Sequence, residues 1–178
     1  MKFFTFLLLL IVSISLVCAN PSTFDSIKSK FTEADTDAHR LALLAEASPV
    51  TADAAAQIVS ALLATHKDLI DATTEVYTFK GTLTSDQSGA IISILVSLQA
   101  CFNGSIPKLV NNKAAITATG HAGDVAERLA ALDGSAGALV AGLQTIVPAS
   151  DKQKVIDVGG KIGTEAFNGC TAFDGKAC

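Results

Sequence analysis

The sequence predicts an all-α protein, a bundle of four to five helices in a single domain. Leucine, isoleucine and valine recur every three or four residues through most of the chain, the period of an α-helix with one buried face. Alanine, the strongest helix former, fills many of the positions between them. Stretches of alternating apolar and polar residues, which indicate half-buried strands, are few.

The first residues predict a secretory signal peptide at residues 1–19. Lys2 precedes an apolar run over residues 3–17, and a polar segment follows the small residue Ala19. The run is short for a membrane span, and no basic cluster follows it. We therefore expect cleavage after Ala19, secretion to the cell exterior or cell wall, and one domain over residues 20–178.

The first two expected helices lie on either side of Pro49. The first begins near Phe24, and its apolar stripe continues to Leu44 between charged positions on the opposite face. The second begins near Thr51 and is expected to end at Gly81, because glycine often follows a helix. Its inward stripe contains Ala55, Ile58, Leu62, Leu69, Thr73 and Val76.

The third helix opens with Thr84 and Gln87, which form a capping-box pattern. Asn103-Gly104 and Pro107 are expected to end or kink this helix, with a bent continuation to about Lys113 as the alternative. Asn103 also begins an Asn-Gly-Ser sequon, so N-glycosylation and a simple helix-ending turn both stay open. The inward stripe contains Ile91, Ile94, Leu95, Leu98, Cys101 and Phe102.

The last third of the chain predicts two more helices. Residues 116–123 are expected to form a loop, followed by a fourth helix over residues 124–147. Ser150 and Gln153 form a second capping-box pattern, from which a fifth helix is expected to run to a loop at Asn168-Gly169. The stripe of the fourth helix includes Val125, Leu129, Leu132, Val140, Leu143 and Ile146.

Charge and hydropathy exclude several partners. The net charge is −4, with 17 acidic against 13 basic residues, which argues against nucleic acid or an anionic membrane as the main partner. After the signal peptide no segment is expected to approach the length or apolarity of a membrane span, and the C-terminal residues 174–178 are expected to lack the apolar tail of a lipid-anchor signal. We therefore do not expect an integral membrane protein.

Three of the four cysteines follow the expected cleavage site: Cys101, Cys170 and Cys178. In an oxidising compartment an odd count allows one disulfide and one remaining thiol. All three pairings are open; the preferred one joins Cys101 to Cys170 or Cys178, since it would attach the C-terminal segment to the middle of the fold. A dimer linked through Cys178 is a further hypothesis.

No pattern indicates catalysis, a metal or a cofactor. The three histidines fall on different predicted segments, and Asp35, one turn before His39, makes at most half a metal site. Ser135 lacks the strand and first glycine of a hydrolase nucleophile elbow. Residues 159–164 lack the strand and spacing of a phosphate loop, and we expect their glycines to serve close packing. The sequence therefore predicts a protein that is not an enzyme.

Two segments carry a resemblance to a known family. Ser85-x-x-Ser88-x-x-Ile91 leads into the apolar third helix, and Lys154-x-x-Asp157-x-x-Gly160 leads to Ala166-Phe167. Together with the signal peptide and the order of the helices, they resemble the fungal hydrophobic surface binding protein A family, which includes cell wall galactomannoproteins. The resemblance extends from about Asp25 to Phe167.

The resemblance implies a secreted helical bundle without catalytic residues. Such proteins adsorb to apolar surfaces, bring secreted hydrolases to them, or hold fatty acids inside the bundle. This chain departs from the family pattern in its three later cysteines and in the interruption at residues 103–107, where that pattern implies a continuous, cysteine-poor helix. It also lacks the Ser/Thr-rich tail of cell wall members, so covalent attachment to the wall is not expected.

The leading hypothesis is a carrier or adsorbing protein for fatty acids, other lipids or hydrophobic surfaces. Small residues between the apolar stripes leave room for an acyl chain, each buried methylene contributing about 0.8 kcal/mol, and a helix end or Tyr77 is expected to hold the polar head. The alternatives have a solid core: a secreted interaction protein, such as an inhibitor or effector, or a structural cell wall protein. The expected lining residues are Ile58, Leu62, Leu69, Tyr77, Ile91, Ile94, Leu95, Leu98, Leu129, Val140 and Leu143.

Overall fold

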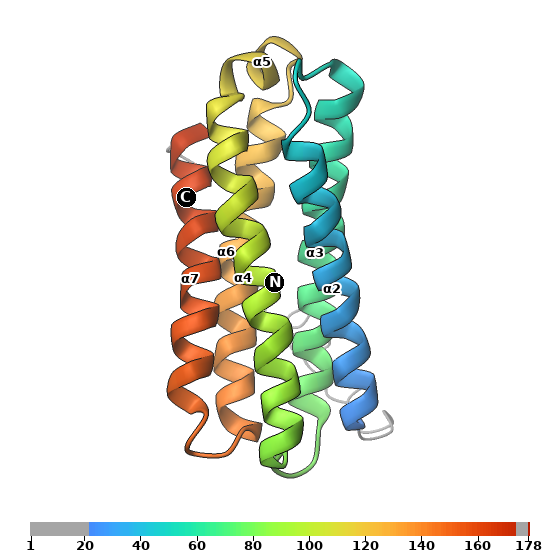
Figure 1. The fold of residues 1–178 in the computed structure, drawn as a ribbon, viewed down its shortest axis with the longest axis vertical. Coiled ribbons are helices and arrows are strands. Elements are labelled where there is room, and N and C mark those ends of the chain that lie inside the picture. The colour runs from blue at the N-terminus through green and yellow to red at the C-terminus, as the bar shows by residue number, and fades with distance from the viewer. Residues whose placement is uncertain (1–21, 174–177) are drawn as a thin grey trace, which may run out of the picture.

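The computed structural model describes residues 22–173 and Cys178, so the predicted signal peptide lies outside the described residues. Every regular element in the described part is a helix, which confirms the predicted fold class (Figure 1). The elements are α2 (Phe24–Ala45), α3 (Ala52–Thr78), α4 (Ser85–Asn111), α5 (Lys113–Ala118), α6 (Ala122–Ile146) and α7 (Lys152–Phe173).

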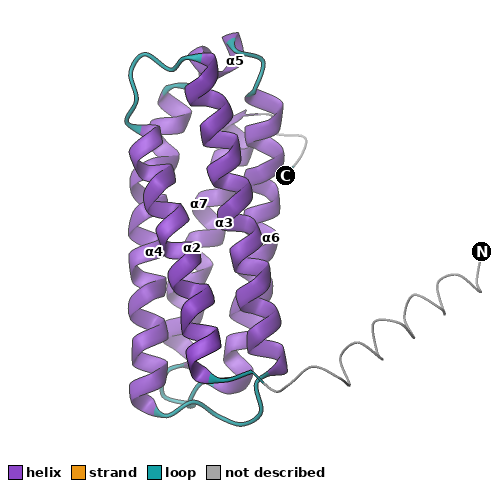
Figure 2. Ribbon diagram, turned by 90° about the vertical axis from the view of Figure 1, so that its right-hand side faces the viewer, coloured by secondary structure: helices purple, strands orange, loops and turns teal. Residues whose placement is uncertain are grey.

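The five long helices form a closed ring. Around it α2 packs against α3, α3 against α6, α6 against α7, α7 against α4, and α4 against α2. Helices α2, α4 and α7 run in one direction along the bundle and α3 and α6 in the other (Figures 1 and 2). At the usual interaxial distance of 8–10 Å, the centre of a regular five-helix ring lies about 8 Å from each axis. All five apolar stripes therefore share one interior.

Three helices begin at a threonine whose hydroxyl accepts a backbone hydrogen bond. Thr23 does this for α2, Thr51 for α3 and Thr84 for α4, and Gln87 completes the predicted capping box at Thr84. Each such cap contributes about 1 kcal/mol. The α3–α4 loop is tied to the end of α6, since the backbone N–H of Leu83 donates to the Ile146 carbonyl over 2.7 Å.

Helix α4 does not end at Asn103-Gly104 or at Pro107. It continues to Asn111, so the expected termination is wrong, and the helix runs on past Pro107 as in the alternative but ends before Lys113. Asn103, Gly104 and Pro107 all lie on the exposed face, while Phe102 and Ile106 on the opposite face are buried. Burial of that face outweighs the local helix-breaking preference and the hydrogen bond lost at proline.

Two other expectations about element boundaries are wrong. Residues 116–118 of the expected 116–123 loop belong to the short helix α5, at the end of the bundle in Figure 2, with Ile116 fully buried. Helix α7 begins at Lys152 and passes through Gly169 to Phe173. Gln153 does not complete a box with Ser150; its side chain donates to the Asp157 carboxylate over 2.8 Å.

Glycines allow α6 and α7 to approach closely. A Cβ atom on Gly159 would lie 2.2 Å from Val140 Cγ2, and one on Gly163 would lie 2.8 Å from Asp133 Oδ1. A Cβ atom on Gly169 would lie 2.7 Å from Ile106 Cγ2, so this glycine serves packing where the sequence predicted a loop. The expectation that the glycines of residues 159–164 mark close packing is confirmed for Gly159 and Gly163 but not for Gly160, whose Cβ atom would meet nothing within 4 Å.

Two helices of the bundle, α4 and α6, are long and apolar enough to cross a membrane by length and composition alone. The sequence-based expectation that no later segment approaches such a span is therefore wrong. In the bundle, 39% of the apolar 18-residue stretch of α4 and 44% of the corresponding stretch of α6 is buried. Their apolar composition is thus also what helices of a packed core require, and it is weak support for a membrane span.

Substitution Gly159→Ala is expected to destabilise the fold by about 1–3 kcal/mol, because the new methyl group overlaps Val140 in a filled contact. The matched control is Gly160→Ala, whose Cβ would meet nothing within 4 Å and which should stabilise the helix by up to about 1 kcal/mol. Urea unfolding of both variants measures the difference. Equal stabilities would contradict the close α6–α7 contact.

Candidate functional site

Most of the predicted lining residues meet in the ring interior. Eight of them are no more than 1% exposed and belong to one core cluster contributed by α3, α4 and α6: Ile58, Leu62, Leu69, Ile91, Leu95, Leu98, Leu129 and Leu143. Ile94 and Val140 are half-buried and pack against the edge of this cluster. The sequence therefore located the apolar interior correctly for three of the five helices.

Tyr77 does not belong to the interior. Its side chain is 57% exposed, and its ring lies over Gly142 of α6, where a Cβ atom would be 3.4 Å from the ring. The reason is its position one residue after the buried Val76, about 100° around the helix. Tyr77 thus cannot hold a polar group inside the ring, and this part of the prediction is wrong.

Two helices that the predicted lining omitted also face the interior. Phe31 of α2 is fully buried, as are Ile27 and Leu41, and α7 contributes Val155 and Ile162. Their signal was the same spacing of three and four residues. The interior also contains many buried alanines, at Ala34, Ala38, Ala45, Ala55, Ala61, Ala72, Ala126, Ala136 and Ala166.

A polar cluster lies at the seam between α3 and α6. His66 Nδ1 is 3.4 Å from the Ser135 hydroxyl, which donates to the Leu132 carbonyl over 3.0 Å. Burial, and then the charge of Arg128, lower the pKa of His66, so the imidazole is neutral at pH 7. Arg128 Nε is buried without a hydrogen-bond partner. Arg128 Nη1 also lies 3.4 Å from the Glu127 carboxylate, so the cluster offers a paired cation with one unused donor, next to a hydroxyl and a neutral imidazole.

An apolar groove lies on the outside of the α6–α7 contact. It has a volume of about 330 Å³ and is lined by glycines of both helices, by the apolar Val140, Ile156 and Phe167, and by the polar Asp133 and Thr164. The Phe167 side chain is 44% exposed and that of Ile156 is 38% exposed. In this groove apolar side chains offer an open surface to a ligand.

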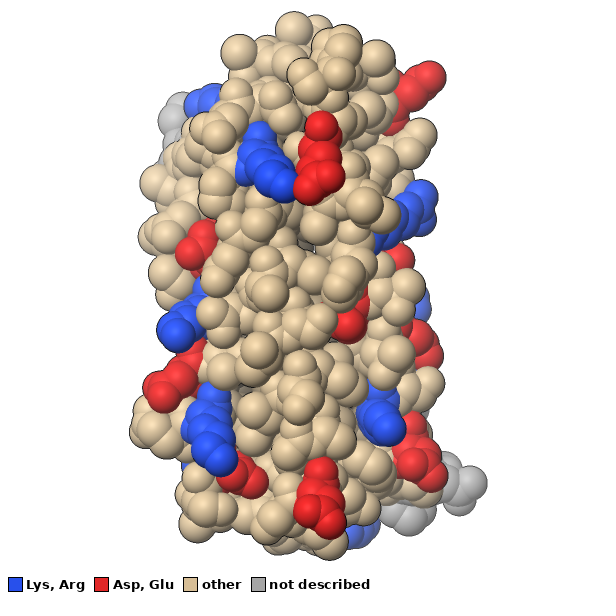
Figure 3. All heavy atoms as spheres, viewed as in Figure 1, with Lys and Arg blue, Asp and Glu red and all other residues tan. Residues whose placement is uncertain are grey.

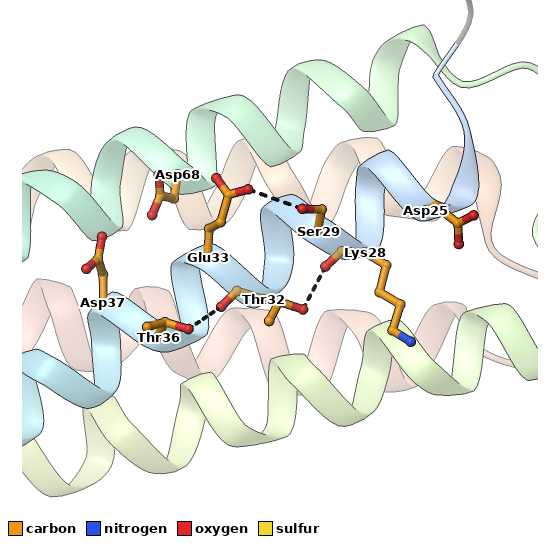
Figure 4. A pocket seen from close by; sticks show the side chains of 8 residues that line it. All are labelled: Asp25, Lys28, Ser29, Thr32, Glu33, Thr36, Asp37 and Asp68. Carbon is orange, nitrogen blue, oxygen red and sulfur yellow. Dashed lines mark hydrogen bonds between the residues drawn. The ribbon is translucent and has the colours of Figure 1, made fainter.

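A larger hollow, of about 630 Å³, lies over α2 and α3 and has a polar lining (Figure 4). Thr32 and Thr36 donate to backbone carbonyls of α2, and Ser29 donates to Glu33. Burial, and then a hydrogen bond with Asp37, raise the pKa of Asp68 to about 6. Hydroxyl and carboxylate groups of this kind suit water rather than an acyl chain.

The disulfide differs from the preferred pairing. Cys170 and Cys178 are bonded to each other, and Cys101 is a free, buried thiol of α4. Cys170 lies on α7, whose C-terminal end is close in sequence to Cys178, so the bond closes a short local loop instead of joining the chain end to α4. With Cys178 bonded within the chain, a dimer linked through that residue is not formed here.

The sequon lies in the middle of α4. Asn103 is exposed, while Ser105, the third residue of the sequon, is 1% exposed and its hydroxyl has no hydrogen-bond partner. The helix-ending turn that was the alternative to glycosylation does not exist, since α4 continues past it. Glycosylation of Asn103 stays a prediction.

Comparison with known proteins defines the fold. No protein-family model and no curated protein matches the chain. AfMP4p in complex with palmitic acid is similar in structure, with a TM-score of 0.78, 20% sequence identity, and coverage of 85% of this chain and all of that one. The ligand binding domain 2 of the Penicillium marneffei MP1 protein, complexed with multiple arachidonic acids, has a TM-score of 0.75 at 15% identity, covering 86% and 97%.

The ligand binding domain 1 of the same MP1 protein, complexed with arachidonic acids, is also similar, with a TM-score of 0.65 and 14% identity. It covers 85% of this chain and 93% of its own. The chain therefore has the fold of these ligand-binding helical domains along nearly its whole described length.

Asp68→Asn is expected to stabilise the protein at pH 7.5 and to have little effect at pH 4.5. A carboxyl group whose folded pKa is raised from 3.8 to about 6 lowers stability as pH rises through that interval, and an amide removes this loss. Thermal unfolding at the two pH values tests this. The control Asp71→Asn removes a carboxylate paired with Lys67 at 3.0 Å and should not stabilise at pH 7.5.

Proposed function

We propose that this protein is a non-enzymatic carrier that binds long-chain fatty acids in the interior of its helix ring. The observation that carries the proposal is the single apolar interior shared by all five long helices, in a fold whose solved neighbours hold palmitic or arachidonic acid. The proposal keeps the lipid-carrier hypothesis drawn from the sequence, and it adds residues of α2 and α7 to the expected lining of the apolar site.

Burial of an acyl chain supplies the driving force. At about 0.8 kcal/mol for each methylene, a 16-carbon chain gains on the order of 10 kcal/mol before costs. The costs are the separation of core side chains and the ordering of the ligand. Small side chains reduce the first cost, because the interior contains many alanines and because α6 and α7 meet through glycines.

We propose that the carboxylate head lies at the α3–α6 seam. Arg128 has a buried Nε without a partner, and its guanidinium is the natural donor for a carboxylate. Its side chain is 31% exposed, so the charged head can stay near water while the acyl chain enters the apolar interior. Ser135 and the neutral His66 supply further polar contacts at the same seam. This placement replaces Tyr77.

Adsorption to apolar surfaces is the second candidate. Several large apolar side chains are exposed outside the ring, including Leu43 at 72% and Val96 at 49%. Helix α4 has no charged residue between Asp86 and Lys108, and Figure 3 shows an uncharged band along the middle of this face, with charges mainly at its sides. An adsorbed protein of this kind would bring secreted hydrolases to such surfaces.

We also propose that the protein is secreted. The predicted signal peptide at residues 1–19 supports this, although it lies outside the described residues. The Cys170–Cys178 disulfide gives independent support, because such bonds persist in oxidising compartments outside the cytosol.

Native mass spectrometry of the protein from culture medium, before and after organic extraction, tests carriage and secretion together. The expected result is a chain beginning at Asn20 that releases fatty acid in near-stoichiometric amount. A protein that is free of lipid and refuses added palmitate would remove the carrier proposal, leaving surface adsorption or an interaction protein with a solid core. A chain that retains residues 1–19 would contradict signal cleavage.

Arg128→Gln is expected to weaken palmitate binding about ten-fold or more, since a charge-assisted contact is worth about 1.4 kcal/mol or more. Binding of hexadecanol, which has the same chain without the charge, should change little. The matched control is Arg40→Gln, which removes the chain's other arginine from an exposed position on α2. Unchanged palmitate affinity, measured by calorimetry, would remove Arg128 from the head site.

A further inference from the structure

A second polar cluster lies at the seam between α2 and α4, separate in function from the proposed lipid site. Asp35 and His39 stand one turn apart on α2, and Cys101 faces them from α4. One potential ligand atom from each side chain lies within 4.8 Å of the other two. The sequence revealed only the Asp35–His39 half of this group, because Cys101 is 62 positions further along the chain than His39.

The Asp35 carboxylate lacks a partner for one of its oxygens. Asp35 Oδ1 is buried without a hydrogen bond, and His39 Nδ1 lies 3.6 Å away. A buried carboxylate oxygen without a partner is unfavourable, and it is stabilised by any cation that reaches it. The Asp35 carboxylate belongs to the group that also contains the thiol of Cys101.

Cys101 is the one free cysteine of the described chain. Burial, and then the charge of Asp35, raise the pKa of its thiol, so that it carries a proton at neutral pH and is a poor nucleophile. A divalent metal changes this balance, because it replaces the proton and bonds to the thiolate. The environment thus disfavours a reactive cysteine and is compatible with a metal-bound one.

His39 makes a backbone hydrogen bond of the kind that metal-binding histidines commonly make. Its Nδ1 lies 2.8 Å from the backbone carbonyl oxygen of Asp35. When Nδ1 donates this hydrogen bond, Nε2 keeps the lone pair that a metal ligand needs, and the bond restricts rotation of the ring. The His39 side chain is 58% exposed, so an ion can reach the seam from solvent.

We propose that Asp35, His39 and Cys101 form a binding site for zinc or a related thiophilic divalent ion. Carboxylate, neutral imidazole and thiolate together carry a charge of −2, which balances M²⁺. The reaction is Cys–SH + M²⁺ → Cys–S⁻–M²⁺ + H⁺, with water as the fourth ligand of a tetrahedral ion. Ligand bonds of about 2.0–2.3 Å require side-chain rotations that draw the three ligand atoms closer together.

The test uses the full secreted chain after chelation and dialysis, titrated with ZnCl₂ by calorimetry in two buffers of different ionisation enthalpy. The expected result is one Zn²⁺ per chain with release of about one proton. Co²⁺ should give a thiolate-to-cobalt charge-transfer band that Zn²⁺ removes. Because copper binds such ligand sets more tightly than zinc, a parallel CuCl₂ titration shows whether copper also occupies the site.

Variants assign the ligands. His39→Gln should weaken Zn²⁺ binding at least ten-fold, and because His39 is largely exposed this variant is expected to fold normally. Cys101→Ser should abolish the cobalt band, with circular dichroism checking its fold. His121→Gln is the matched control, since His121 also pairs with a carboxylate, that of Asp124 at 3.0 Å, and should leave binding unchanged. Absence of stoichiometric Zn²⁺ binding, or binding that neither His39→Gln nor Cys101→Ser weakens, overturns the proposal.

Discussion

Each of the five long helices must bury an apolar stripe against two neighbours at once, and the rest of the structure depends on that closure. The ring closes because many inward positions carry alanine or glycine, which lets helices approach without leaving large voids. The α6–α7 contact has no room for a larger side chain at Gly159, since a single methyl group there would overlap Val140. Larger residues at these positions would push the helices apart and expose the shared interior.

Closure also decides where polar chemistry can lie. A charge inside an apolar ring would lose its hydration, so the ionisable groups that penetrate the bundle are found at seams between helices. Arg128 and His66 lie at the α3–α6 seam, and Asp35 and His39 lie at the α2–α4 seam. Both clusters combine a partly exposed side chain with a buried atom that lacks a partner. Both proposed sites therefore lie at seams between helices, between the apolar interior and the solvent.

The helices themselves were predictable because their signals are local. A stripe such as Ile27, Phe31, Ala34 and Ala38 requires only the helical period, and the Thr84–Gln87 capping box requires two residues three positions apart. Most of the interior proposed from the sequence followed from these patterns. The misplaced Tyr77 shows their limit, because a residue next to a buried one in sequence points about 100° away from it.

The sequence by itself determined the all-α class, most of the inward residues of the helices, and that three cysteines after the predicted signal peptide leave one thiol unpaired. Only the tertiary structure decided the ring order, the continuity of α4 through Pro107, and which cysteine stays free. Helical period and capping depend on residues within one or two turns. The encounters of His66 with Ser135 and of Asp35 with Cys101 depend on which helices become neighbours, and that follows from the packing of all five together.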